Sequence, residues 1–130
     1  MIAIDSNVLL RFFQHDNDPV QSERAQKAVK QHAPVFVNDV VLAEFVWTCK
    51  RTFKLDRIEI HKRLEAIGES TEFIVARPQV FERALRGYGA RTSDFADWLI
   101  GEANLEHGCE ATLTFDTDAV KGRGFRLVAG

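Results

Sequence analysis

Short apolar runs alternate with longer amphipathic segments along the whole chain. The apolar runs predict five strands, at residues 1–4, 34–37, 72–75, 111–115 and 124–128. Helical spacing and capping residues predict six helices: 8–13, one opening at 18, 40–53, 56–67, one from 78 to the glycines at 87 and 89, and one from 93 or 94 to about 107. This alternation is typical of an α/β domain with a mainly parallel central sheet flanked by helices.

Acidic residues follow two of the predicted strands. The first strand ends abruptly in Asp5, Ser6 and Asn7 before an apolar segment resumes, and the strand at 111–115 ends at Asp116 and Asp118. An acid at the end of a buried strand lies at the carboxyl edge of the sheet, where open α/β sheets bind their ligands. Because parallel strands bring their carboxyl ends to one edge, we expect Asp5 and Asp116 to lie there together.

Further acids interrupt the predicted helices. Glu44 is the lone charge in an apolar segment. It either fills a solvated gap in the apolar stripe or, if buried, needs a cation or a donor, because burying an unpaired carboxylate is costly. Asp94 and Asp97 lie three residues apart on the first turn of one helix. The helix dipole is a purely structural reason for acids there, and it is weaker for Asp97, which lies a turn inside the helix.

Composition limits the class of protein. A chain of 130 residues, 45% hydrophobic and 28% charged, fits a single globular domain spanning 1–130. No apolar run is long enough to cross a bilayer, and the amino terminus lacks the features of a secretory signal. Cys49 and Cys109 have no metal-ligand spacing, so we expect reduced thiols in a cytoplasmic protein. The net charge of −2 argues mildly against a nucleic-acid partner, but if metal held four of the 19 acids, 17 Lys and Arg would face 15 acids, so charge alone does not decide the partner.

Several carboxylates at one sheet edge would repel one another and hold each pKa above its usual value. A hard divalent cation such as Mg²⁺ or Mn²⁺ removes that penalty, because it prefers oxygen ligands. Such a cation acidifies a bound water and stabilises charge on a phosphoryl oxygen. The reaction class that follows is metal-assisted hydrolysis of a phosphodiester.

Four segments of the chain carry a family pattern. They are Ile4-Asp5-Ser6-Asn7-Val8-Leu9-Leu10-Arg11, Leu42-Ala43-Glu44-Phe45, Asp94-Phe95-Ala96-Asp97-Trp98-Leu99-Ile100 and Leu113-Thr114-Phe115-Asp116-Thr117-Asp118. In this order and spacing they resemble the PIN-domain ribonucleases, and most closely the VapC toxins of prokaryotic toxin–antitoxin pairs. The resemblance covers nearly the whole chain and implies a PIN-like three-layer α/β/α fold.

The resemblance also implies an acidic site at Asp5, Glu44, Asp97 and Asp116. In the family these acids bind one or two Mg²⁺ or Mn²⁺ ions and position the water that attacks the phosphate. The implied metal ligands are Asp5, Asp97 and Asp116, with Asp118 as an additional candidate. Glu44 is implied both in the metal's surroundings and in orienting or deprotonating the water.

Neighbouring residues are expected to support this site. Ser6 stands where the family more often has threonine, so the hydroxyl is kept, and Asn7 matches the family's asparagine, which orients an acid. Asp94 is expected to cap its helix or to support the ligands rather than to bind metal. Some arginines could bind RNA phosphates or be solvated surface charges. They are Arg11, Arg86 and Arg91.

The function implied by the resemblance is that of an endoribonuclease toxin acting on transfer or ribosomal RNA. The implied partners are a small VapB-like antitoxin, which blocks the acidic site, and a second copy of the chain in a homodimer. Two alternatives stand beside it: a receiver-type phosphoacceptor domain, and a PIN fold kept for RNA binding or scaffolding without catalysis. A receiver needs an acid pair after its first strand, where this chain has Asp5 alone.

Overall fold

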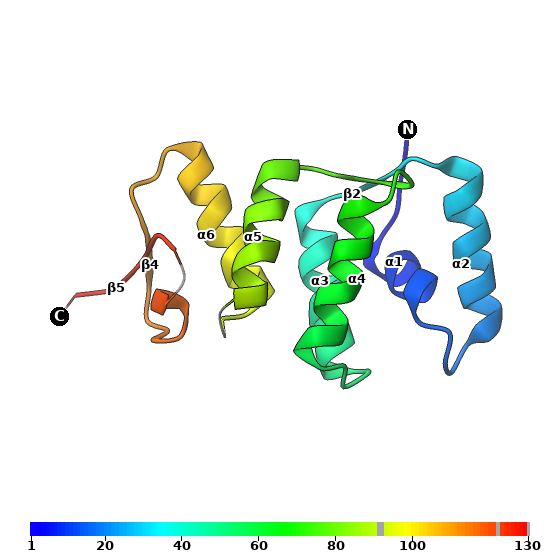
Figure 1. Cartoon of the computed structure of the whole chain (residues 1–130), viewed down its shortest axis with the longest axis horizontal. Helices are drawn as coiled ribbons and strands as arrows, with labels where there is room; N and C mark the ends of the chain where they lie inside the picture. The colour runs from blue at the N-terminus through cyan, green and yellow to red at the C-terminus, as the bar shows by residue number, and fades with distance from the viewer. Residues whose placement is uncertain (91–92, 122, 130) are drawn as a thin grey trace. The chain divides into compact units, whose positions relative to one another are not determined.

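The computed structural model describes residues 1–90, 93–121 and 123–129, and its chain divides into two compact units, Met1–Ala76 and Arg77–Gly130 (Figure 1). Six α-helices alternate with five strands in the described part, and every strand pair found there is parallel. The predicted α/β class with a mainly parallel sheet is therefore confirmed. Within the same ranges, no helix combines the length and the apolar character that crossing a membrane requires.

The first unit is built on a parallel sheet with the strand order β1-β2-β3. Its strands are β1 (Ile2–Ala3), β2 (Val35–Val37) and β3 (Phe73–Val75). Ala3 pairs with Phe36, which in turn pairs with Ile74. The strand order follows the chain order, and two helices lie in each connection between neighbouring strands.

Four helices connect these strands, and the residue before each helix caps it with its side chain. They are α1 (Ser6–Phe13), α2 (Pro19–His32), α3 (Asp39–Arg51) and α4 (Arg57–Glu69). The capping oxygens, which accept backbone N–H groups of the first turn, belong to Asp5, Asp18, Asn38 and Asp56. Helix α1 packs against α2 and α3, and α3 packs against α4 (Figure 1).

A polar contact inside the first unit ties α1, α3 and α4 together. Arg63 donates from Nη2 to Oε1 of the buried Gln14 at 2.8 Å. Its guanidinium also lies 6.0 Å from the ring centroid of Phe13 and 3.7 Å from Sγ of Cys49. Burial raises the pKa of the Cys49 thiol, and the neighbouring Arg63 charge offsets this only in part. Cys49 is therefore a packed, protonated thiol and not a reactive one.

The second unit pairs two helices with a small sheet. Its elements are α5 (Pro78–Ala90), α6 (Phe95–His107), β4 (Thr112–Thr114), the 3₁₀ helix η1 (Ala119–Lys121) and β5 (Phe125–Leu127). Helices α5 and α6 pack side by side, and β4 pairs with β5 (Figure 1). The fully buried Phe95 meets Phe81 and Tyr88 edge-on, with ring centroids 6.2 and 5.7 Å apart. This aromatic cluster holds the start of α6 against α5.

Gly87 lies inside α5. The glycines at 87 and 89 were expected to end this helix, and it runs one residue past them, to Ala90. A Cβ at Gly87 would overlap the six-membered ring of Trp98 on α6, and Trp98 is buried. Gly87 is therefore required by the close approach of the two helices, and it does not terminate the helix.

Candidate active site

Asp5 lies at the carboxyl edge of the first unit's sheet, where β1 leads into α1. Its backbone is extended (φ −89°, ψ 178°), and Oδ1 accepts the N–H of Val8 at 2.9 Å. The side chain is exposed, and it makes no other polar contact within the described residues. One carboxylate oxygen thus holds the helix start while the other is available to a cation.

Ser6 and Asn7 form the first turn of α1, which begins two residues earlier than predicted because Asp5 caps it. Neither side chain hydrogen-bonds to another residue in the ranges that the structure covers. Asn7 is exposed and lines an open pocket between α1 and α2. The supporting role expected of these two residues stays a prediction.

Glu44 lies on the second turn of α3 and is exposed, although its neighbour Phe45 is fully buried. It therefore occupies the solvated position that was one of the two interpretations of its sequence context. The N-cap residue of α3, Asn38, directly follows β2, the parallel neighbour of β1. Glu44 and Asp5 are thus carried by two packed helices that both start at the same edge of this sheet.

Three acids gather in the second unit. Asp94 is the N-cap residue of α6, Asp97 lies in the first turn, and Asp116 follows β4. Burial, and then the charges of Asp94 and Asp116, raise the pKa of Asp97 above its usual value. The helix dipole alone would favour the charged form at this position. Desolvation and repulsion therefore outweigh the dipole, and the three carboxylates lie within electrostatic reach of one another.

Local hydrogen bonds hold the turn that carries Asp116. Its Oδ1 accepts the N–H of Asp118 at 2.9 Å, and its own N–H donates to Thr114 Oγ1 at 3.0 Å. The buried Ser93 donates from Oγ to the carbonyl oxygen of Asp118 at 2.7 Å. Ser93 thereby joins the start of α6 to this turn. From the sequence it was considered only as a helix cap, because its partner lies 25 residues away.

A comparison with known protein families bears directly on these acids. The family model described as the PIN domain matches residues 2–124. This chain belongs to the PIN-domain family. The family predicted from the sequence is thus confirmed. This PIN domain is also 26% identical over 134 residues to a VapC ribonuclease of Aquifex aeolicus (strain VF5), and the match covers 98% of this chain and 96% of that protein.

The predicted RNA-binding arginines of this PIN domain differ in their surroundings. Arg11 is half-buried: Nη1 donates to the carbonyl oxygen of Asp16 at 3.2 Å, and the guanidinium carbon lies 5.7 Å from the ring centroid of Phe53. Arg86 forms an exposed ion pair, at 3.2 Å, with a glutamate one turn earlier on α5. Arg91 lies outside the described residues. RNA binding by these residues stays a prediction.

The carboxylates of the PIN domain fit a hard divalent cation by their chemistry. Among residues 1–90, 93–121 and 123–129, no group of three or more His, Cys, Asp or Glu side chains is arranged to hold a metal ion. The two charged groups that raise the pKa of Asp97 are nevertheless carboxylates, whose oxygens suit Mg²⁺ or Mn²⁺. A cation beside Asp97 and Asp116 would also relieve the repulsion that raises the pKa of Asp97.

The Asp97→Asn substitution should make the metal-free PIN domain more stable at neutral pH. The pKa of Asp97 is higher in the folded protein than its usual value of 3.8. The free energy of unfolding of the wild type therefore falls as the pH rises from the usual pKa to the raised one. Asparagine carries no charge, so the variant avoids this loss of stability. The gain in the free energy of unfolding should be less than about 1 kcal/mol, because the side chain is partly exposed. Urea unfolding in EDTA should show the gain at pH 7 and not below the usual pKa. A less stable variant at pH 7 would mean that the charged carboxylate stabilises the fold.

Proposed function

We propose that this protein is a metal-dependent endoribonuclease toxin of the VapBC type, which hydrolyses phosphodiester bonds in transfer or ribosomal RNA. The observation that carries the proposal is the crowding of carboxylates around Asp97 in a PIN domain. The similarity to a VapC ribonuclease over nearly the whole chain supports the same reaction.

In this proposal five acids serve one reaction. Asp5, Asp97 and Asp116 hold one or two Mg²⁺ or Mn²⁺ ions, and Asp118 is an additional ligand. When bound, the cation lowers the pKa of a bound water and neutralises charge on a phosphoryl oxygen. Glu44, exposed on α3, orients the attacking water and accepts its proton. The water oxygen then bonds to phosphorus as the bond to the leaving ribose oxygen breaks.

Supporting residues complete the proposed site. Ser6 and Asn7 orient Asp5 by hydrogen bonding from the first turn of α1. Asp94, at the start of α6, supports Asp97 without binding the metal. Both units of the chain work together as one PIN domain spanning residues 1–130, which the continuous family match supports.

The proposed partners are RNA, a small VapB-like antitoxin and a second copy of the chain, all in the cytoplasm. Trp47 on α3 is 60% exposed and lies against Arg51, with the guanidinium carbon 5.8 Å from its ring. Tryptophan and arginine are enriched at protein interfaces. This surface supports a protein partner, whether antitoxin or second subunit.

The alternatives differ in what now supports them. Membership of the PIN family removes the support for a receiver-type phosphoacceptor domain. A PIN fold that binds RNA without cleaving it stands as the second candidate, since no preformed group of metal ligands lies in the described part of the chain.

Cleavage of structured RNA should require Mg²⁺ or Mn²⁺. Because the proposed acids need a cation to activate water, EDTA should stop the cleavage and an excess of metal should restore it. Denaturing gels of end-labelled transfer RNA incubated with the purified protein provide the measurement. Cleavage that continues in EDTA would contradict the metal requirement. Binding of the same RNA with no cleavage in either metal would favour the non-catalytic alternative.

A further inference from the structure

An open pocket of about 390 Å³ lies between α1 and α2, within the first unit. Helix α2 contributes Gln21, Arg24 and Ala28, which recur every three or four residues and so share one helix face. Helix α1 contributes Arg11 from the face that packs against α2. None of the proposed catalytic acids lines this pocket.

The lining of the pocket is partly apolar and partly polar. Val8, Ala25 and Ala28 form its apolar part, and their small size keeps the space between the helices open. The polar lining residues include Arg11 and Arg24, and no acidic residue lines the pocket. Such a lining favours an anionic group attached to an apolar body.

Both arginines have unused hydrogen-bond donors. Nε of Arg11 is buried and has no hydrogen-bond partner among the described residues. Arg24 is exposed and forms neither an ion pair nor a hydrogen bond with any residue that the structure describes. Helix α2 also carries Lys27 and Lys30 against a single acid, Glu23. The pocket therefore presents the unpaired guanidinium of Arg24 beside the partly engaged guanidinium of Arg11, in a positive setting. Guanidinium groups match phosphate oxygens in geometry.

We propose that this pocket binds a backbone phosphate of the RNA, separate from the phosphate that reacts. The inference rests on the proposed ribonuclease function. Asn7 lines the pocket and lies two residues after Asp5, so part of the pocket lining lies at the same end of α1 as that acid. Arg11 follows one turn later, about 6 Å along the helix axis. An RNA strand that follows α1 reaches the pocket directly from Asp5, and its ribose carbons meet the apolar lining.

Arg24 is the residue to change, because Arg11 also holds the Asp16 carbonyl and packs on Phe53. Lys27 provides the matched control: K27Q removes the same charge from the same helix at a position outside the pocket lining. Fluorescence anisotropy of a labelled oligouridine, titrated in EDTA at increasing KCl, measures affinity without cleavage. We expect R24Q to weaken binding about tenfold and to reduce the salt slope by roughly 0.7, the value for one phosphate of a single strand.

The two controls sharpen this expectation. K27Q should change affinity by about twofold or less, since a solvated charge contributes only to the general field. R24K should recover part of the affinity, because the charge is kept while the planar fork is lost. In cleavage assays, the loss in R24Q should fall on KM more than on kcat.

Equal weakening by R24Q and K27Q, with equal salt slopes, would overturn the phosphate pocket. Metal-dependent RNA cleavage would then still support the proposed function. If the wild-type protein neither binds the oligouridine nor cleaves RNA, both proposals fail. If R24Q weakens binding of a synthetic glutamate-rich peptide and leaves RNA affinity unchanged, the pocket docks an acidic peptide and the RNA proposal is overturned.

Discussion

Replacing Asp5 by asparagine should reduce RNA cleavage by about 1000-fold, or about 4 kcal/mol in activation free energy. The substitution removes a charged oxygen that the proposed cation needs. It keeps a side-chain oxygen that can accept the N–H of Val8, and asparagine caps helices as well as aspartate does. The free energy of unfolding should therefore change little. Initial cleavage rates and urea unfolding of the same preparation measure the two quantities.

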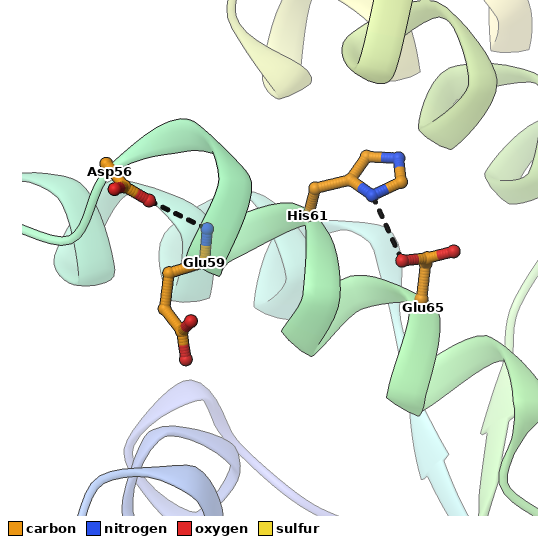
Figure 2. A network of polar contacts seen from close by, with 4 residues as sticks. All are labelled: Asp56, Glu59, His61 and Glu65. Carbon is orange, nitrogen blue, oxygen red and sulfur yellow. Dashed lines mark hydrogen bonds and ion pairs between the residues drawn. The ribbon is translucent and has the colours of Figure 1, made fainter.

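Asp56 offers a matched control for this experiment. It caps α4 as Asp5 caps α1, with Oδ1 accepting the N–H of Glu59 at 2.8 Å (Figure 2). One turn further on, His61 and Glu65 form a local pair at 3.2 Å that does not involve Asp56 (Figure 2). D56N removes the same charge from the same kind of helix start and should cleave RNA within about twofold of the wild-type rate.

The two variants together decide what Asp5 does. If D5N and D56N both cleave at the wild-type rate, the activity comes from another site or from a contaminating nuclease. If both lose activity alongside a drop in stability, the loss reports folding and not chemistry. Loss in D5N alone, with stability kept, is the result expected of a residue that holds the cation.

Much of the fold could be predicted, because the signals that mark its elements are local. Two short patterns predict helix starts: Asp18 is followed by proline, and Asp56 is followed by an acid three residues later. The reason for Gly87 could not be predicted in this way. Position 87 requires glycine because the ring of Trp98 lies against it. The local sequence pattern does not indicate this contact between two helices.

In the candidate site too, local signals could be predicted from the sequence and effects of tertiary packing could not. Asp5 and Asp116 could be proposed from sequence because strand ends mark them. The raised pKa of Asp97 depends on desolvation and on the approach of Asp116, neither of which a spacing rule reports. Arg24 is one of several charged residues on α2, and nothing in its sequence context distinguishes it. Only the packing of α2 against α1 places it in one pocket with Arg11.

Replacing Phe95 by alanine should lower the free energy of unfolding by about 3–5 kcal/mol, the usual cost of removing a buried aromatic ring. Phe95 is the first residue of α6, has no exposed surface, and contacts Phe81 and Tyr88. Phe115 in the same unit is 86% exposed, so F115A is the matched control and should change stability by about 0.5 kcal/mol or less. Urea unfolding followed by tryptophan fluorescence measures the difference.

The same variant tests whether the chain is one cooperative domain. The PIN match runs through both units without a break, and a domain of this size usually unfolds in one transition. We therefore expect F95A to reduce hydrogen-exchange protection in α3 of the first unit as well as in α6. The buried Phe45 marks the part of α3 where protection should be highest in the wild type. Protection lost in α6 and kept in α3 would mean that the units unfold separately. Asp97 would then belong to a unit that can unfold while the first unit stays folded.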